Sequence, residues 1–232
     1  MLIKPPSRTD LHEAYAAPGC PVCALLSRSE RRYIDATLYE HVTDVRWRGE
    51  VRAARGFCAL HTEHVLHVGR SALGVSLVAA DIIKTLREIL PNARPNAASN
   101  ALSRLRSSLG GTNAQANLLR PQQPCPICTY LAELGAIYIA ALIDDVATAQ
   151  GQAAYKRSVG LCLPHLAAAV QRGSEGITAV LEHQAQTWEQ LEGELNEFIR
   201  KSDYQYSGEP MESERDAWRR ALRLLAGTYL TD

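Results

Sequence analysis

The sequence has 232 residues, of which 46% are hydrophobic, so the chain can bury one large core or two smaller ones. Its 25 Lys and Arg residues are balanced by 25 Asp and Glu residues, which argues against a nucleic-acid binder held by bulk charge. The N-terminus lacks the apolar stretch of a targeting signal, and no uninterrupted apolar run reaches about 18 residues. We therefore expect a cytoplasmic protein that does not span a membrane.

The first half of the chain shows four segments with apolar residues at helical spacing. These predicted helices cover about residues 24–42, 44–54, 58–68 and 75–89. Asp44 suits the N-cap of the second helix, and Pro91 ends the fourth. The second half shows the same pattern over Leu131–Leu142 and Ile177–Phe198, and no segment has the alternation of a β-strand.

Two cysteine motifs account for all six cysteines, and each motif occurs twice in the same order. Cys20–Cys23 reads Cys-Pro-Val-Cys and returns 105 residues later as Cys-Pro-Ile-Cys at Cys125–Cys128. Gly56–His61 has the pattern Gly-x-Cys-x-x-His and returns 104 residues later at Gly160–His165. Such self-similarity predicts one supersecondary unit that is used twice with pseudo-twofold symmetry.

Residues 91–124, rich in Pro, Asn, Ser and Gly, are typical of a linker, with one short helix near Ala101–Leu109. A polar loop over Lys201–Met211 precedes a final helix over about Glu212–Leu225. We therefore predict an all-α fold with two pseudo-symmetric helical units, each clamped by one metal site. The predicted parts are a first unit (1–92), a linker (93–124), a second unit (125–202) and a C-terminal loop and helix (203–232).

The cysteine and histidine spacing predicts two metal sites, because thiols in the cytosol stay reduced and are available as ligands. Pairing the motifs within each repeat gives two Cys3His sites, one from Cys20, Cys23, Cys58 and His61, the other from Cys125, Cys128, Cys162 and His165. Three cysteines and one histidine suit tetrahedral zinc, so we expect two zinc ions per chain. Four protein ligands leave no open coordination position, which favours a structural role over a catalytic one.

An iron–sulfur cluster is the main alternative to zinc, since Cys-Pro also occurs at cluster ligands, although a histidine ligand is less usual there. A dithiol redox use of the Cys-Pro-x-Cys pairs is weaker, because no βαβ pattern accompanies them.

At these motifs the chain resembles a family of uncharacterised bacterial proteins that is classed as a domain of unknown function. The matching segments are Gly19–Cys23, Arg55–His61, Cys125–Cys128 and Gly160–His165, with further similarity over Glu197–Tyr204 and at Glu214, Trp218 and Gly227. The resemblance extends over nearly the whole chain. It implies a helical metal-binding protein but no activity.

Three further groups of polar residues are candidates for function. His64 and His67 follow His61 at intervals of three, but only His61 has a counterpart in the second repeat, so we expect the other two on an exposed face. Residues 111–232 carry 15 Asp and Glu against 10 Lys and Arg, so the second half is acidic. The first half carries an arginine cluster that suits either a phosphate or acidic partner or a solvated face pairing with the acidic second half: Arg46, Arg48, Arg52 and Arg55. The C-terminal segment carries a polar cluster that suits a ligand pocket or a loop docking the final helix: Lys201, Asp203, Tyr204, Glu209 and Glu214.

Taken together, the residues favour an interaction or regulatory scaffold that binds another protein. The alternatives are an iron–sulfur redox or sensor protein, and an enzyme with a polar pocket near the C-terminal segment. No Ser/His/Asp set, phosphate loop or paired carboxylate motif stands out, so the sequence identifies neither catalytic residues nor a small-molecule ligand.

Overall fold

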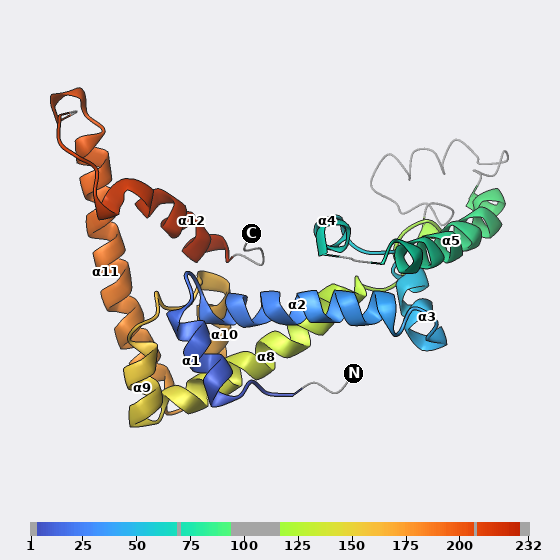
Figure 1. The fold of residues 1–232 in the computed structure, drawn as a ribbon, viewed down its shortest axis with the longest axis horizontal. Helices are drawn as coiled ribbons and strands as arrows, with labels where there is room; N and C mark the ends of the chain where they lie inside the picture. The colour runs from blue at the N-terminus through green and yellow to red at the C-terminus, as the bar shows by residue number, and fades with distance from the viewer. Residues whose placement is uncertain (1–3, 69–70, 94–116, 207, 228–232) are drawn as a thin grey trace, which may run out of the picture. The chain divides into compact units, whose positions relative to one another are not determined.

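The computed structural model describes residues 4–68, 71–93, 117–206 and 208–227 (Figure 1). Over these residues the chain is helical and forms no β-strand, which confirms the predicted all-α class. The predicted short helix near residues 101–109 lies outside the described residues.

The helices of the first half follow the predicted segments closely, and one more precedes them. Their bounds are α1 Arg8–Ala16, α2 Pro21–Tyr39, α3 Val45–Ala53, α4 Ala59–Val68 and α5 Ala72–Ile89, with a 3-10 turn η1 at Leu90–Ala93. Asp44 caps α3 as expected, because its side chain accepts a hydrogen bond from the Trp47 N–H.

The helix α1, which precedes the first cysteine motif, was not predicted from the sequence. The Ser7 hydroxyl accepts from the Asp10 N–H while the Asp10 carboxylate accepts from the Ser7 N–H, which forms a capping box. Leu11 and Tyr15 are buried, and the Tyr15 hydroxyl donates to Asp145 at 3.0 Å. A helix of nine residues offers too few apolar positions for its periodicity to be recognised.

The second half repeats the order of α2–α5 as α8–α11 and adds a C-terminal helix. Their bounds are α8 Pro126–Val146, α9 Ala149–Tyr155, α10 Leu163–Arg172, α11 Ile177–Lys201, the 3-10 turns η2 Tyr204–Tyr206 and η3 Ser213–Asp216, and α12 Ala217–Ala226. The predicted final helix is therefore present, and the 3-10 turn η3 forms its first part.

The helix α8 is long and apolar enough to cross a membrane, judged by length and composition alone. Half of its most apolar window is buried inside the protein, including Leu134, Leu142 and Ile143. A helix that packs on several sides within a protein core needs the same composition. Because Glu133 interrupts the apolar residues of α8, the sequence shows no uninterrupted apolar run of that length there.

The chain divides into two compact units that do not coincide with the repeat-based division. We call Met1–Ser29 with Ala132–Asp232 the terminal unit, and Glu30–Leu131 the central unit. The helix α2 begins in the terminal unit and ends in the central unit, whereas α8 begins in the central unit and ends in the terminal one. Each compact unit therefore contains segments from both repeats.

The lengths of α2 and α3 explain why a repeat does not close on itself. With 19 residues, α2 carries the chain about 28 Å from its first cysteine motif, at ~1.5 Å per residue. The nine residues of α3 span only about 13 Å and cannot return the chain to its starting point. Pairing of the cysteine motifs within one repeat would need such a return.

Each unit has its own apolar core. In the terminal unit the fully buried side chains include Tyr15, Leu26, Leu142, Ile143, Tyr155 and Leu161. In the central unit they include Ile34, Leu38 and Ile127. Beside this central core, Tyr33 stacks on Tyr130 with ring centroids 4.3 Å apart, and the Trp47 indole N–H donates to the Tyr33 hydroxyl at 3.1 Å.

Two glycines at corresponding places in the repeats allow close packing at the starts of α5 and α11. A Cβ at Gly74 would lie 2.1 Å from the Leu38 carbonyl oxygen near the end of α2. A Cβ at Gly176 would lie 2.2 Å from the Ile143 carbonyl oxygen near the end of α8. Leu38 and Ile143 are themselves 105 residues apart, the offset of the first cysteine motif. Glycine is therefore required at both positions for steric reasons.

We expect Gly74→Ala and Gly176→Ala each to lower the free energy of unfolding by about 1–3 kcal/mol, the usual cost of overpacking. The matched control is Gly193→Ala on α11, where a Cβ meets no atom within 4 Å. This control should be neutral or stabilising by up to ~1 kcal/mol, because alanine favours helix over glycine. Denaturant titration measures all three variants, and equal stabilities would contradict the packing described.

Candidate metal centres

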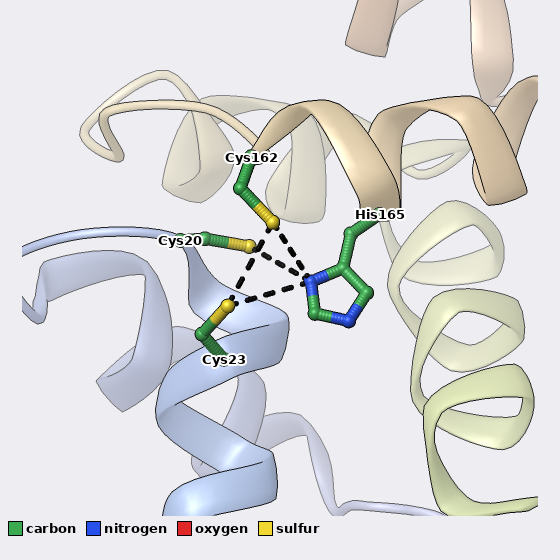
Figure 2. Close-up of side chains that lie close together, drawn as sticks. All are labelled: Cys20, Cys23, Cys162 and His165. Carbon is green, nitrogen blue, oxygen red and sulfur yellow. Dashed lines mark hydrogen bonds between the residues drawn. The ribbon is translucent and has the colours of Figure 1, made fainter. Parts of the chain in front are cut away.

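The terminal unit gathers Cys20, Cys23, Cys162 and His165 into one group that could hold a metal ion (Figure 2). The three sulfurs surround the His165 Nδ1, at 3.5 Å for Cys20, 3.5 Å for Cys23 and 3.0 Å for Cys162. The Cys23 and Cys162 sulfurs are 3.7 Å apart, and all four residues are buried. We call this group the terminal-unit site.

The central unit gathers Cys58, His61, Cys125 and Cys128 in the same manner. The His61 Nδ1 lies 3.1 Å from the sulfur of Cys58, 3.6 Å from that of Cys125 and 3.2 Å from that of Cys128. The Cys58 and Cys128 sulfurs are 3.7 Å apart. We call this group the central-unit site.

Each site draws its ligands from both repeats, so the predicted pairing within a repeat is wrong. The first Cys-Pro-x-Cys motif meets the second Cys-x-x-His motif at the terminal-unit site, and the remaining two motifs meet at the central-unit site. The eight predicted residues are the residues that come together, but in the crossed combination. The pairing failed because it required α3 to bring the chain back along α2.

The local structure around each motif explains its residues. Pro21 and Pro126 occupy the first position of α2 and α8, where a missing N–H costs nothing and φ is preset for a helix. Gly56 and Gly160 have φ of 105° and 79°, a left-handed conformation that turns the chain before each Cys-x-x-His motif. All four motifs lie at helix N-termini, whose partial positive charge favours thiolates.

The two sites differ in the charge of their histidine when no metal is bound. Burial disfavours a charged His165, but contacts with the Cys162 and Cys20 sulfurs outweigh burial and raise its pKa to about 9. At the central-unit site, burial and the neighbouring His64 lower the pKa of His61 to about 4. A metal ion needs a neutral imidazole, so loading the terminal-unit site releases a histidine proton at neutral pH, whereas His61 is already neutral.

Accessibility also distinguishes the two sites. Cys58 and Cys128 are partly exposed, whereas all four residues of the terminal-unit site are buried. The end of α12 contributes to that burial: a Cβ at Gly227 would lie 3.2 Å from the Cys162 sulfur and 3.8 Å from that of Cys23. The backbone at Gly227 therefore approaches the sulfurs closely.

A model of a family of unknown function, DUF6062, matches residues 9–232. The chain belongs to this family. The resemblance inferred from the cysteine motifs is thereby confirmed for nearly the full length of the chain. No curated protein and no solved structure matches the chain.

A third polar group, which was not predicted from the sequence, lies behind the central-unit site. Glu30, His61 and His64 are all buried, with ligand-type atoms close together. The expectation that His64 lies on an exposed face is wrong, because only 2% of it is exposed. His67 is exposed, as expected.

A signal for Glu30 was present in the sequence. This carboxylate falls midway between Leu26 and Ile34, one helical turn from each, on the buried stripe of α2. A charged residue inside an apolar stripe predicts a buried partner.

The arginine cluster is engaged in interactions inside the central unit. Arg48 and Arg52 both pair with Asp81 on α5, at 3.3 and 2.8 Å, and Arg46 pairs with Glu50. The Arg55 guanidinium donates to the carbonyl oxygens of Arg52 and Leu118. Within the part of the chain that the structure describes, the ion pairs of this cluster are made with Asp81 and Glu50, acids of its own half.

The polar C-terminal cluster holds the segment after α11 in place. The Lys201 ammonium donates to the buried Glu214 carboxylate at 2.7 Å and to the Pro210 carbonyl oxygen at 2.9 Å. The Lys201 bond, together with backbone N–H groups, lowers the pKa of Glu214 to about 2. Arg200 binds Glu197 and Glu209. These contacts favour the docking role over a ligand pocket.

Double cysteine variants test the crossed combination directly. We expect Cys20→Ser with Cys58→Ser to lose both metal ions, because these residues belong to different sites. Cys58→Ser with Cys125→Ser should lose only one ion, because both residues serve the central-unit site. Metal per chain is measured by mass spectrometry of the purified variants. Pairing within repeats requires the opposite result, one ion lost by the first variant and two by the second.

Proposed function

We propose that the protein binds two zinc ions, one at each Cys3His site. The observation that carries this proposal is the spacing of the ligand atoms. With Zn–S of ~2.3 Å and Zn–N of ~2.0–2.1 Å, a tetrahedral zinc site has sulfurs about 3.8 Å apart and sulfur–nitrogen edges of about 3.5 Å. The Cys23 and Cys162 sulfurs are 3.7 Å apart, and so are the Cys58 and Cys128 sulfurs. The nitrogen–sulfur distances in the two sites range from 3.0 to 3.6 Å.

The same spacing weighs against an iron–sulfur cluster. A cluster places iron and sulfide atoms between its protein ligands, so ligands on different irons stand farther apart than the ligands of one ion. In each site all four ligand atoms lie within 4.8 Å of one another, which fits a single shared ion. A mixed thiolate and imidazole set is also the usual composition of a closed structural zinc site.

The role that these sites support best is that of a helical scaffold for interaction with another protein. Each site has four protein ligands, which leaves no coordination position for a substrate. Each also closes a long loop: 138 residues separate Cys23 from Cys162. Exposed apolar side chains on α12, including Trp218, Leu222 and Leu225, are of the kind that protein partners contact.

Purification without added metal should yield colourless protein with two zinc ions per chain and no acid-labile sulfide. Elemental analysis, a sulfide assay and a visible spectrum of anaerobically prepared protein measure this directly. Brown protein with iron and sulfide at cluster stoichiometry would overturn the zinc assignment.

Removing the metal should destabilise both compact units. Structural zinc binding contributes roughly 10–16 kcal/mol in small zinc peptides, whereas a whole domain is typically stable by about 5–15 kcal/mol. We therefore expect a strong chelator to lower the thermal midpoint markedly and to increase amide exchange around both sites. Cys58→Ser should increase exchange in the central unit, including Cys125–Leu131, and leave the residues around Cys162 protected. An unchanged midpoint after complete metal removal would contradict a structural role.

A further inference from the structure

Behind the central-unit site lies a buried carboxylate that contacts the metal-facing histidine. The His61 Nδ1 faces the three sulfurs, while its Nε2 lies 3.5 Å from the Glu30 Oε1. The same carboxylate oxygen pairs with the His64 Nδ1. Glu30 is 2% exposed and His61 is 4% exposed, so neither group is solvated.

The chemistry of imidazole determines which ring nitrogen of His61 carries the proton in this contact. A metal bound at the His61 Nδ1 requires that nitrogen to be deprotonated, so the single proton of the neutral ring must sit on Nε2. A carboxylate this close to Nε2 attracts the positive end of the N–H group and so stabilises that tautomer. It also increases the electron density on the ring and hence its strength as a ligand.

His64 holds the carboxylate in position. Its ring stands at 89° to the His61 ring, with centroids 5.6 Å apart, and its Nδ1 is the second partner of the Glu30 oxygen. His61 and His64 are three residues apart on α4, so they share a helix face. Glu30 therefore meets two imidazoles from one helix, which restricts its rotamer.

The other site lacks both residues at the corresponding positions. The first motif offset of 105 takes Glu30 to Gly135, and the second offset of 104 takes His64 to Ala168. A Cβ at Gly135 would meet only Leu26 at an ordinary 3.8 Å, so an apolar side chain packs there. Two sites with the same ligand types thus differ in what stands behind them.

We propose that Glu30, held by His64, is a positioning residue that fixes the tautomer and orientation of His61 and strengthens metal binding at the central-unit site alone. The proposal rests on the proposed function, since it concerns the metal at that same site. Two sites with identical ligand sets then differ in their affinity for the metal. The carboxylate thus acts at the site whose Cys58 and Cys128 are partly exposed.

The test replaces zinc by ¹¹³Cd, so that NMR gives one resonance for each site, and measures how each resonance declines against a competing chelator. Cys58→Ser assigns the central-unit resonance. Glu30→Ala should weaken cadmium binding there by about 10–100-fold, the usual effect of losing such a carboxylate. Glu30→Gln, which keeps an acceptor oxygen without the charge, should give a smaller loss. His64→Ala should lie between Glu30→Gln and Glu30→Ala.

Three readouts separate positioning from a general loss of stability. The terminal-unit resonance of the same molecules should keep its shift and affinity, which also shows that each variant folds. Two control variants should leave the central-unit resonance unchanged. They are His67→Ala, an exposed histidine of the same helix, and Asp145→Asn, which removes a buried carboxylate from the terminal unit. In the wild type, ¹⁵N shifts of His61 should report metal at Nδ1 and a proton at Nε2, and Glu30→Ala should move the Nε2 signal.

Several outcomes would overturn the proposal. If Glu30→Ala weakened cadmium binding equally at both sites, Glu30 would only stabilise the core. If the cadmium affinity were unchanged, Glu30 would not position His61. A third cadmium ion that depends on His64 would make Glu30, His61 and His64 a separate metal site. Failure of the wild type to bind two ions would refute the proposed function itself, whereas two ions with Glu30-independent affinity would refute only this inference.

Discussion

The structure depends on the meeting of two helix N-termini at each Cys3His group. At the terminal-unit site these belong to α2 and α10, and at the central-unit site to α8 and α4. Each terminus supplies two ligands from its first turn, where unpaired N–H groups and the helix dipole favour thiolates. Because the two helices of a site come from different repeats, neither repeat can complete a site without the other. The chain is thus tied together by contacts between residues far apart in sequence.

This arrangement gives a reason for the two compact units and for the composition of the long helices. The helices α2 and α8 each contribute to both units, in opposite order along the chain. Each therefore buries side chains along most of its length, from Val22 to Leu38 in α2 and from Ile127 to Val146 in α8. By length and composition α8 is also apolar enough to cross a membrane, while half of its most apolar stretch is buried in the protein. The glycines at positions 74 and 176 let the starts of α5 and α11 pack directly against the ends of α2 and α8.

The two Cys3His groups have the same residue types but unequal surroundings. The terminal-unit site is buried on all sides and is approached by the backbone at Gly227. The central-unit site is partly exposed and has the Glu30–His64 pair behind its histidine. A shared ligand set therefore does not imply a shared role, because the neighbours of the ligands control the protonation and the accessibility of a metal centre.

The sequence alone determined the helical class, most helix positions and all eight candidate ligands, because periodicity, caps and short motifs are local properties. It did not reveal α1, whose apolar face is short, or the role of Glu30, whose partners come from another helix. The combination of the eight ligands was decided only by the tertiary structure. Motif order and spacing fit both pairings equally well, and the choice depends on whether a nine-residue helix can reverse the path of a 19-residue one. It cannot, so the chain completes each site with the other repeat.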